Sequence, residues 1–392
     1  MLTLTGRVIW QEKRTAQRQV FSLSTNRTLP QPLRGGKAFL AKGSGPIPVG
    51  FAHYLAFNSR PEALEDGMPC ILLGDEFRYL DDDDVIALSS DGRVRSLYRA
   101  SSNHNSLLLT EQCNNYCLMC SQPPKRVDDS WLLHEAKETV RVIPRETRNL
   151  GITGGEPTLY GDEFIGLLYH IKNWLPHTSL HILSNGRTFA DAQFSEKYAA
   201  VNHPDMMVGI PVYSADPARH DYVVQARGAF DETIRGILNL KRLNQKVEIR
   251  IVLHKQTCQG LPELAEFIAR NLLFVDHVAL MALEMTGFTR ANLDALWIDP
   301  IEYKSELSKA VKILRSYGLK TSVYNHPLCL VNRDVETSYV KSISDWKNEY
   351  ATECEPCVRK SDCGGFFSSG IRHGYSKSIQ PFLSVMSGTE RS

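Results

Sequence analysis

The chain has 392 residues, of which 42% are hydrophobic and 23% charged, and these ordinary globular values exclude disordered and fibrous proteins. At roughly 150 residues per domain, the length predicts two or three domains. The 45 basic and 44 acidic residues nearly cancel, so charge gives no reason to expect a nucleic-acid or anionic-membrane partner. Because we find neither an apolar run of about eighteen residues nor a secretory signal, we expect a cytoplasmic protein without a membrane partner.

Short strand-like runs, separated by Gly, Pro, Asn and Asp, indicate a β-rich domain over residues 1–104. Asp91-Gly92 predicts a two-residue hairpin turn with positive φ. No amphipathic helix of normal length is expected before His104, and the acidic run Asp81–Asp84 is interpreted as a solvated turn. The expected strands are Leu2–Trp10, Arg18–Leu23, Phe51–Phe57, Pro69–Leu73, Val85–Leu88 and Val94–Tyr98.

From Ser106, strand-like and helix-like segments alternate. This pattern predicts an α/β domain over residues 105–285, with a parallel sheet that helices cover and that closes as an open or partial barrel. Such sheets carry their chemistry at the carboxyl ends of the strands. The expected strands are Leu107–Thr110, Asn149–Thr153, Ser179–Leu183, Met206–Tyr213, Val247–Leu253 and Val275–Leu283, and the expected helices are Leu132–Ile143, Glu163–Trp174, Phe189–Ala199, Phe230–Leu243 and Leu261–Asn271.

After Thr286 the alternation stops, and residues 286–392 are expected to form a C-terminal extension. A helix is predicted at Glu302–Tyr317 and a strand at Lys320–Tyr324, followed by cysteine-bearing loops and a polar tail from Tyr375.

The chain has nine cysteines. In a reducing cytoplasm, spaced cysteines indicate metal ligands or redox groups rather than disulfides. Cys70 and Cys258 are interpreted as ordinary buried thiols. The other seven form two groups: Cys113, Cys117 and Cys120, and then Cys329, Cys354, Cys357 and Cys363.

The first group has the spacing C-x3-C-x2-C and directly follows the first strand of the alternating series. Three thiolates are one short of a closed zinc site, and the nearest histidines, His104 and His134, lack finger-like spacing. Three cysteines do suit a [4Fe–4S] cluster in which three irons are ligated and the fourth iron stays open. The spacing therefore favours iron–sulfur over zinc.

These cysteines resemble those of the radical SAM superfamily, and Gly154-Gly155-Glu156-Pro157 stands where that superfamily carries its GGEP loop. The resemblance implies a partial (βα)6 barrel that binds a [4Fe–4S] cluster and S-adenosylmethionine. Glu156 would accept the charge of the methionyl ammonium beside the two glycines. The cofactor would generate a 5′-deoxyadenosyl radical that abstracts a hydrogen atom from the substrate.

Further positions match the superfamily more loosely. The resemblance implies ribose contacts for Ser184 and Asn185, and a methionyl carboxylate or ribose contact for Ser214. Met119 stands where an aromatic residue is common, and it would pack on the adenine differently. Arg250 is interpreted either as a cofactor contact or as a surface ion-pair partner.

The second group reads C-x2-C-x5-C with Cys329 further upstream, and four such thiolates could hold structural zinc or a second cluster. Behind a radical SAM core, this spacing resembles the auxiliary-cluster extensions of the SPASM and twitch group. It departs from a full SPASM domain at Phe367, where that domain has another cysteine. The resemblance implies one auxiliary [4Fe–4S] cluster, with zinc as the alternative. Ligation by all four cysteines would close the cluster, whereas without Cys329 one iron would stay open.

Longer stretches, Glu111–Pro124, Ser342–Tyr350 and Cys363–Gly370, look like the His-Xaa-Ser system radical SAM maturases. That resemblance implies an enzyme that modifies a small precursor peptide with His-Xaa-Ser repeats. It would work beside a second radical SAM maturase, a small accessory protein and an electron donor such as flavodoxin.

Two alternatives stay open: another SPASM- or twitch-type radical SAM enzyme, such as a protein activase or an RNA-modifying enzyme, and a metal-stapled binding scaffold without catalysis. The neutral net charge argues against RNA. Residues 1–104 are hypothesised to hold the precursor or the accessory protein through an exposed sheet edge. The alternative is a domain that only caps the barrel.

Overall fold

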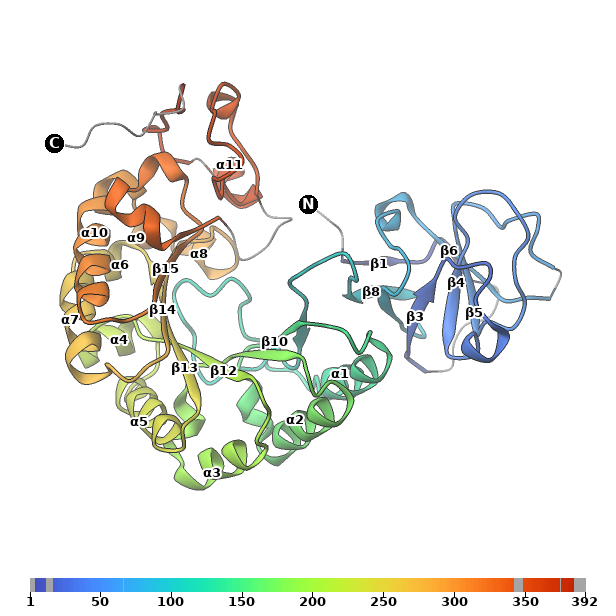
Figure 1. Ribbon diagram of the computed structural model, residues 1–392, viewed down its shortest axis with the longest axis horizontal. Coiled ribbons are helices and arrows are strands. Elements are labelled where there is room, and N and C mark those ends of the chain that lie inside the picture. The colour runs from blue at the N-terminus through green and yellow to red at the C-terminus, as the bar shows by residue number, and fades with distance from the viewer. Residues whose placement is uncertain (1–3, 12–16, 66, 342–347, 374, 384–392) are drawn as a thin grey trace.

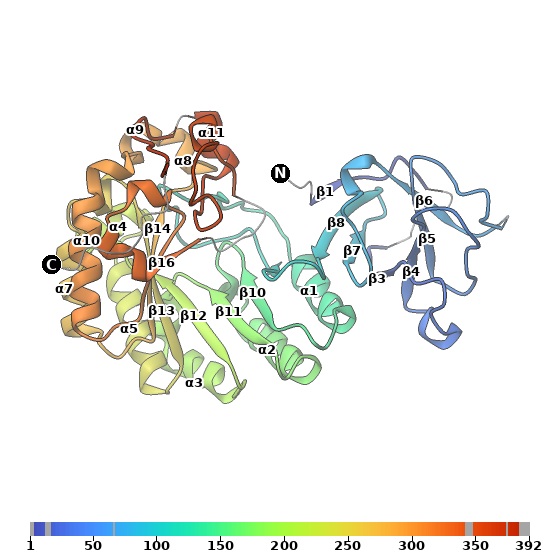
Figure 2. The ribbon, with the colours of Figure 1, turned by 45° about the horizontal axis from the view of Figure 1, so that its top comes forward.

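The computed structural model describes residues 4–11, 17–65, 67–341, 348–373 and 375–383. These residues contain two eight-stranded sheets, which lie in two lobes (Figures 1 and 2). None of the described helices combines the length and the hydropathy that a membrane crossing requires.

In the N-terminal sheet, one segment of the chain pairs with the strands at both ends of the sheet. Its strand order is β1-β8-β7-β3-β4-β5-β6-β2, so the neighbouring strands β1 and β2 lie at its two edges and pair antiparallel with β8 and β6. Alternate side chains such as Leu23, Leu40 and Leu73 fill the interior. The strands are β1 (Thr5–Arg7), β2 (Trp10–Gln11), β3 (Gln19–Ser24), β4 (Lys37–Leu40), β5 (His53–Phe57), β6 (Cys70–Leu73), β7 (Val85–Leu88) and β8 (Arg93–Tyr98), with 3-10 turns η1 (Gln31–Leu33) and η2 (Asp75–Phe77).

Three details of this lobe differ from the expectations. The sequence analysis missed β4, which is short and follows a Gly-Gly pair. The β7–β8 connection has four residues, 89–92, and only Gly92 has a positive φ, of 78°. The last residue of the acidic run, Asp84, is buried rather than solvated, because its carboxylate accepts hydrogen bonds from the Asp81 and Ala100 amides at 2.9 and 2.7 Å. Burial raises the pKa of this carboxyl.

The second sheet is a partial barrel of parallel strands in chain order, so the predicted α/β fold is confirmed. It has eight strands instead of six, because β15 and β16 extend it past residue 285 and lead into the cysteine-rich loops. The strands are β9 (Ser106–Leu108), β10 (Asn149–Thr153), β11 (Ser179–Leu183), β12 (Met206–Pro211), β13 (Lys246–Leu253), β14 (His277–Ala282), β15 (Thr321–Tyr324) and β16 (Tyr339–Val340).

Helices cover the outer face of this barrel (Figure 1). The long ones are α1 (Trp131–Val142), α2 (Asp162–Trp174), α3 (Ala192–Ala200), α5 (Ala229–Arg242), α7 (Leu261–Asn271) and α10 (Pro300–Ser316). The shorter ones are α4 (Pro217–Val224), α6 (Lys255–Cys258), α8 (Phe288–Ala291), α9 (Leu293–Leu296) and α11 (Ser368–His373), together with the 3-10 turns η3 (Pro157–Tyr160), η4 (Arg187–Ala190), η5 (Leu328–Leu330), η6 (Arg333–Ser338) and η7 (Thr352–Cys354). Cys70 and Cys258 are buried, as expected. Residues 342–347 of the segment Ser342–Tyr350, and the polar tail beyond 383, fall outside the described residues.

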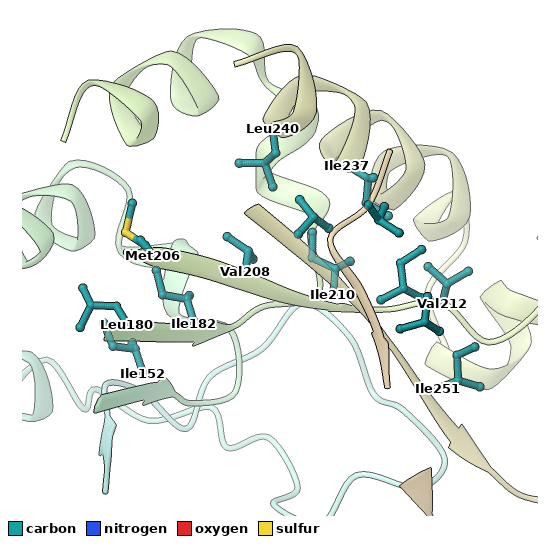
Figure 3. Packing of buried hydrophobic residues seen from close by; sticks show 14 of the residues in the cluster. Ile152, Leu180, Ile182, Met206, Val208, Ile210, Val212, Ile237, Leu240 and Ile251 are labelled. Carbon is teal, nitrogen blue, oxygen red and sulfur yellow. The ribbon is translucent and has the colours of Figure 1, made fainter. Parts of the chain in front are cut away.

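The two faces of the barrel strands differ in chemistry. The outward side chains are aliphatic, and Figure 3 shows Val208 and Ile210 packed against Ile237 and Leu240 of α5. Side chains alternate between the two faces of each strand, and several of the inward positions carry small or polar residues. They include Gly151, His181, Gly209, Glu248 and Arg250. The inside of the barrel is therefore an open space with several polar side chains rather than a packed core.

Helix α1 joins the two lobes. It packs against β3 and β7, and its buried Glu135 accepts hydrogen bonds from Arg18 at 2.5 Å and from Arg95 at 2.7 Å. The Arg18 guanidinium also stacks on the Trp131 ring, 3.6 Å from the ring centre.

Candidate active site

The first cysteine group lies on a loop after β9 that has no regular secondary structure. Backbone hydrogen bonds hold this loop against the end of α4: the Tyr116 amide donates to the Val224 carbonyl at 3.0 Å, and the Leu118 amide donates to the Val223 carbonyl at 2.9 Å. The loop therefore depends on a helix that the sequence analysis did not predict.

Residues after β14 bind three consecutive carbonyls of the same loop. The Asn292 side chain donates to Leu118 at 2.9 Å, the Thr289 hydroxyl to Met119 at 3.1 Å, and the Phe288 amide to Cys120 at 2.8 Å. These bonds fix the backbone of the loop that carries the three thiols.

The three thiols of this loop are close enough to interact electrostatically. Burial raises the pKa of Cys113 to about 11, and it also raises the pKa of Cys117 and Cys120. The neighbouring sulfurs raise the pKa of Cys117 further. A cationic metal centre would reverse this trend, because it favours thiolates. In the described part of the chain, no three His, Cys, Asp or Glu side chains converge as one bound metal ion requires. A [4Fe–4S] cubane requires a wider arrangement than a single ion does, because each thiolate ligates a different iron.

The GGEP loop runs in contact with the cysteine loop. The Gly155 amide donates to the Thr110 carbonyl at 2.7 Å, and the Glu156 amide donates to the Gln112 carbonyl at 2.8 Å. A Cβ atom on Gly155 would lie 2.1 Å from the Gln112 oxygen, so only glycine permits this approach. Pro157, which is buried, begins the 3-10 turn η3 that follows.

The Glu156 carboxylate is fully buried and has only uncharged donors. It accepts hydrogen bonds from the Thr158 amide at 3.1 Å and hydroxyl at 2.6 Å, from the Ser184 hydroxyl at 2.8 Å and from the Asn185 amide at 2.6 Å. Burial raises its pKa despite these bonds. A buried charge is normally paired, so this carboxylate suits a cationic ligand such as an ammonium group.

The other predicted cofactor residues already have partners within the protein. The side-chain amide of Asn185 donates to Asn114 at 2.6 Å and lies 4.0 Å from the Cys113 sulfur. The Ser214 hydroxyl accepts from the Asp216 amide at 3.0 Å, and the Met119 side chain is buried in an apolar cluster with Tyr213. Their contacts with the cofactor stay predictions.

Arg250 is an ion-pair partner, but inside the barrel rather than at the surface. Its guanidinium donates to Glu248 at 2.7 Å and to the Met281 sulfur at 3.1 Å. The sequence reasoning missed Glu248, and it also missed Arg187, which donates to the Asn114 carbonyl and the Asn115 side chain, both at 2.7 Å. No motif marks these residues, and only their position at strand ends or on the inward face could have indicated them.

The second cysteine group surrounds one cavity. All four of its cysteines line this cavity together with Tyr350: Cys329, Cys354, Cys357 and Cys363. The Leu328 and Gly365 amides both donate to the Cys363 sulfur at 3.3 Å, as amides do to metal-bound thiolates. Cys329 therefore lies with the other three, as ligation by all four requires.

A cavity of about 770 Å³ occupies the inside of the barrel. Residues of both lobes line it, including Leu4 and Ser96 of the N-terminal lobe and His181, Glu248 and Tyr324 of the barrel.

Comparison with known proteins agrees with the cysteine and GGEP loops. Residues 107–268 match the family described as the Radical SAM superfamily. Residues 107–268 therefore form a radical SAM domain, and domains of this superfamily use a [4Fe–4S] cluster and S-adenosylmethionine. The residues described above fit the cluster and S-adenosylmethionine. Three thiols lie on one loop, a glycine lets two loops touch, and a buried carboxylate has no cationic partner.

Among solved structures, part of the chain is similar to SuiB of Streptococcus suis bound to S-adenosylmethionine, with 18% identity and a TM-score of 0.43 over 57% of this chain and 51% of SuiB. It is also similar to anSMEcpe with bound AdoMet (17% identity, TM-score 0.41, 56% of this chain and 63% of that one). A third similar structure is the radical S-adenosylmethionine methyltransferase TsrM of Kitasatospora setae, with 14% identity and a TM-score of 0.36 over 50% of this chain and 47% of TsrM. The chain spans about half the length of SuiB. No curated protein matches the sequence.

Proposed function

We propose that this enzyme is a peptide maturase whose substrate is a precursor peptide with His-Xaa-Ser repeats. The observation that carries the proposal is the cavity inside the barrel, because both lobes line it and its volume of about 770 Å³ is large enough for a peptide segment. Two of the similar proteins have been solved with peptides, SuiB with its precursor SuiA and anSMEcpe with Cp18Cys.

In this proposal the cysteine loop would hold the catalytic cluster through Cys113, Cys117 and Cys120. When bound, the cluster and S-adenosylmethionine supply a 5′-deoxyadenosyl radical that takes a hydrogen atom from the substrate. Glu156 accepts the methionyl ammonium, and Gly154, Gly155 and Pro157 shape the backbone around it. Ser184, Asn185 and Ser214 lie at the ends of the next two strands, where they would orient the cofactor.

The second cysteine group would hold one auxiliary [4Fe–4S] cluster with all four iron positions ligated. The shared cavity of Cys329, Cys354, Cys357 and Cys363 supports this assignment over a cluster with an open iron. Such a cluster would relay electrons or brace the C-terminal loops rather than bind the substrate.

The N-terminal lobe would contribute a wall of the substrate cavity. The hypothesis that an exposed sheet edge binds the precursor is weakened. One segment of the chain supplies both β1, which pairs with β8, and β2, which pairs with β6, and so joins the two ends of the N-terminal sheet. Leu4 and Ser96 instead face the cavity from this lobe. The second maturase, the accessory protein and an electron donor such as flavodoxin remain proposed partners.

Anaerobic reconstitution tests the proposal at the level of the clusters. We expect about eight irons per chain, four for each cubane. Replacing Cys113, Cys117 and Cys120 by Ala should remove about half of the iron and abolish formation of 5′-deoxyadenosine, whereas Cys70→Ala, at a buried thiol outside both groups, should change neither. Cleavage of S-adenosylmethionine by the triple variant would refute the cluster assignment.

Mass spectrometry of a precursor peptide with His-Xaa-Ser repeats tests the substrate. A mass change that requires S-adenosylmethionine and the three cysteines would support the maturase. Formation of 5′-deoxyadenosine with an unchanged peptide would point to another radical SAM substrate. If no 5′-deoxyadenosine formed, the binding scaffold would be favoured.

A further inference from the structure

Four polar side chains from three strands meet inside the barrel. Glu248 on β13 accepts a hydrogen bond from Arg250 at 2.7 Å and shares one of 2.6 Å with His277 of β14. Nε2 of His181, on β11, lies 3.3 Å from the same carboxylate. Burial alone raises the pKa of Glu248, but the two imidazoles and the Arg250 charge outweigh burial and hold it well below its ordinary value. Glu248 is therefore an anion that holds the other three groups in place.

Glycines make room for this cluster. A Cβ atom on Gly209 of β12 would lie 2.9 Å from the Arg250 chain and 3.0 Å from the His181 ring. Gly151 of β10 also lines the cavity, and a Cβ atom there would lie 2.3 Å from the Ser106 hydroxyl. Strands seldom carry glycine at interior positions without a packing reason. The inner face is thus shaped for these polar groups and for the space beside them.

The carboxylates that line the cavity already have partners from the chain. Glu248 has three partners, which are His181, Arg250 and His277. Asp205 pairs with Lys246 at 2.8 Å, and Asp276 pairs with Lys241 at 2.7 Å. The carboxylates of the cavity therefore have cationic or imidazole partners already.

The donors of the same cavity have capacity to spare. Arg250 has five N–H groups, and its partners are one carboxylate and the Met281 sulfur, which is a weak acceptor. The His181 side chain is 40% exposed, but its Nε2 is buried beside Glu248, so a ligand would meet the exposed part of the ring. Within the described part of the chain, no carboxylate pairs with Lys320, which directly precedes β15. A ligand that completes these bonds must supply acceptors, and a carboxylate does so best beside cations.

We propose that the barrel cavity binds an acidic side chain of the peptide substrate, with its carboxylate held by Arg250 and His181 and attracted by Lys320. The proposal rests on the proposed function, since it names a feature of that peptide. Glu248 and His277 are positioning residues here. Arg250 thereby has a substrate role instead of the cofactor role that the sequence analysis considered.

Two synthetic peptides test the site: Gly-Ser-Gly-Glu-Gly-Ser-Gly and its Gln counterpart, both with blocked ends. Binding to the anaerobic, iron-loaded full chain is measured by calorimetry. We expect the Glu peptide to bind at least about tenfold more tightly, as a charge-assisted hydrogen bond predicts. Arg250→Met should remove this preference and leave the affinity for S-adenosylmethionine unchanged. Arg242→Met, at an exposed arginine of α5, is the matched control and should keep the preference.

Iron content and the thermal midpoint establish whether each variant folds. If Arg250→Met does not fold, His181→Leu replaces it and should reduce the preference at least threefold. Equal binding of the two peptides to the wild type would overturn the proposal, and so would a preference that survives in the folded variant. A tenfold preference without any peptide modification would uphold the cavity site and refute the proposed function. Modification of the precursor without the preference for the Glu peptide would support the proposed function and overturn the cavity site.

Discussion

At the scale of single residues, Glu156 has both a structural and a binding role. Its carboxylate ties the ends of β10 and β11 together through the Ser184 hydroxyl and the Asn185 amide. Because none of its donors is charged, the buried carboxylate also lacks the counter-ion that such groups normally have. The motif alone indicates only the second role.

We expect Glu156→Gln to weaken binding of S-adenosylmethionine by about 1.5–3 kcal/mol, the value of a charge-assisted hydrogen bond. The variant should also lower the free energy of unfolding by about 1–3 kcal/mol, because an amide NH2 would face donors that now meet a carboxylate oxygen. Calorimetric titration and urea unfolding measure the two effects. Glu163→Gln, at an exposed position on α2, is the control for a charge change alone. Unchanged cofactor affinity in a folded, iron-loaded Glu156→Gln would show that the ammonium binds elsewhere.

A second prediction at this scale concerns Gly155. Gly155→Ala should prevent the contact between the GGEP and cysteine loops, because its Cβ atom would lie 2.1 Å from a backbone oxygen that cannot move aside. Reconstituted iron should fall by about half, as when only the second cluster forms. Gly166→Ala, in the middle of α2 with open space around its Cβ position, should keep the iron and stabilise the protein by up to about 1 kcal/mol. Equal iron in the two variants would contradict the close approach of the loops.

At the scale of elements, α1 belongs to the barrel but is held by both lobes. The Glu135 carboxylate is 4% exposed and pairs with Arg18 and Arg95 of the N-terminal lobe. A chain that begins near Ser101 would leave this carboxylate buried without a cation. Such a truncation therefore tests stability as much as peptide binding.

Glu135→Gln should lower the free energy of unfolding by about 2–4 kcal/mol, because it leaves two arginines without their buried partner. One turn along the same helix, Glu138 pairs with Arg141 at the surface, so Glu138→Gln should cost less than about 1 kcal/mol. Urea unfolding of the two variants gives the comparison. Equal losses would mean that the joint between the lobes is no stronger than a surface ion pair.

At the scale of the whole molecule, three buried histidines make the fold sensitive to acid. Burial lowers the pKa of His220 and His326 to about 4 and that of His254 to about 3. All three are neutral in the folded protein at pH 7, whereas in the unfolded chain they take up protons near pH 6.5. The unfolded state thus binds more protons below this pH, and stability falls as the pH drops from about 6.5 towards 4.

The variant His254→Asn should flatten this decline. Asn keeps an acceptor for the Gln256 amide, which His254 now caps at 3.2 Å, but it does not titrate. Urea unfolding at pH 7.5, 6.5 and 5.5 measures the slope for both proteins. The same loss of stability between pH 7.5 and 5.5 in both would contradict a neutral, buried His254.

Local pattern was sufficient for much of the fold. The predicted bounds of β7, β10 and β11 equal those in the structure, because each is a short alternating or apolar run between turn residues. Spacing also marked the two cysteine groups and the GGEP loop as candidate sites, since most of their residues are close in the chain. β4 and β16 were missed because short strands carry little periodic signal.

The sequence by itself thus determined the radical SAM domain and most barrel strands, and it supplied the prediction of the metal ligands. Only the tertiary structure decided that the segment of β1 and β2 closes the N-terminal sheet and that Cys329 shares a cavity with the other three cysteines. It also decided that His181, Glu248 and His277 meet, although 67 and 29 residues separate them along the chain. The physical reason is register: which inward side chains become neighbours depends on how distant strands pair, and no local pattern contains that information.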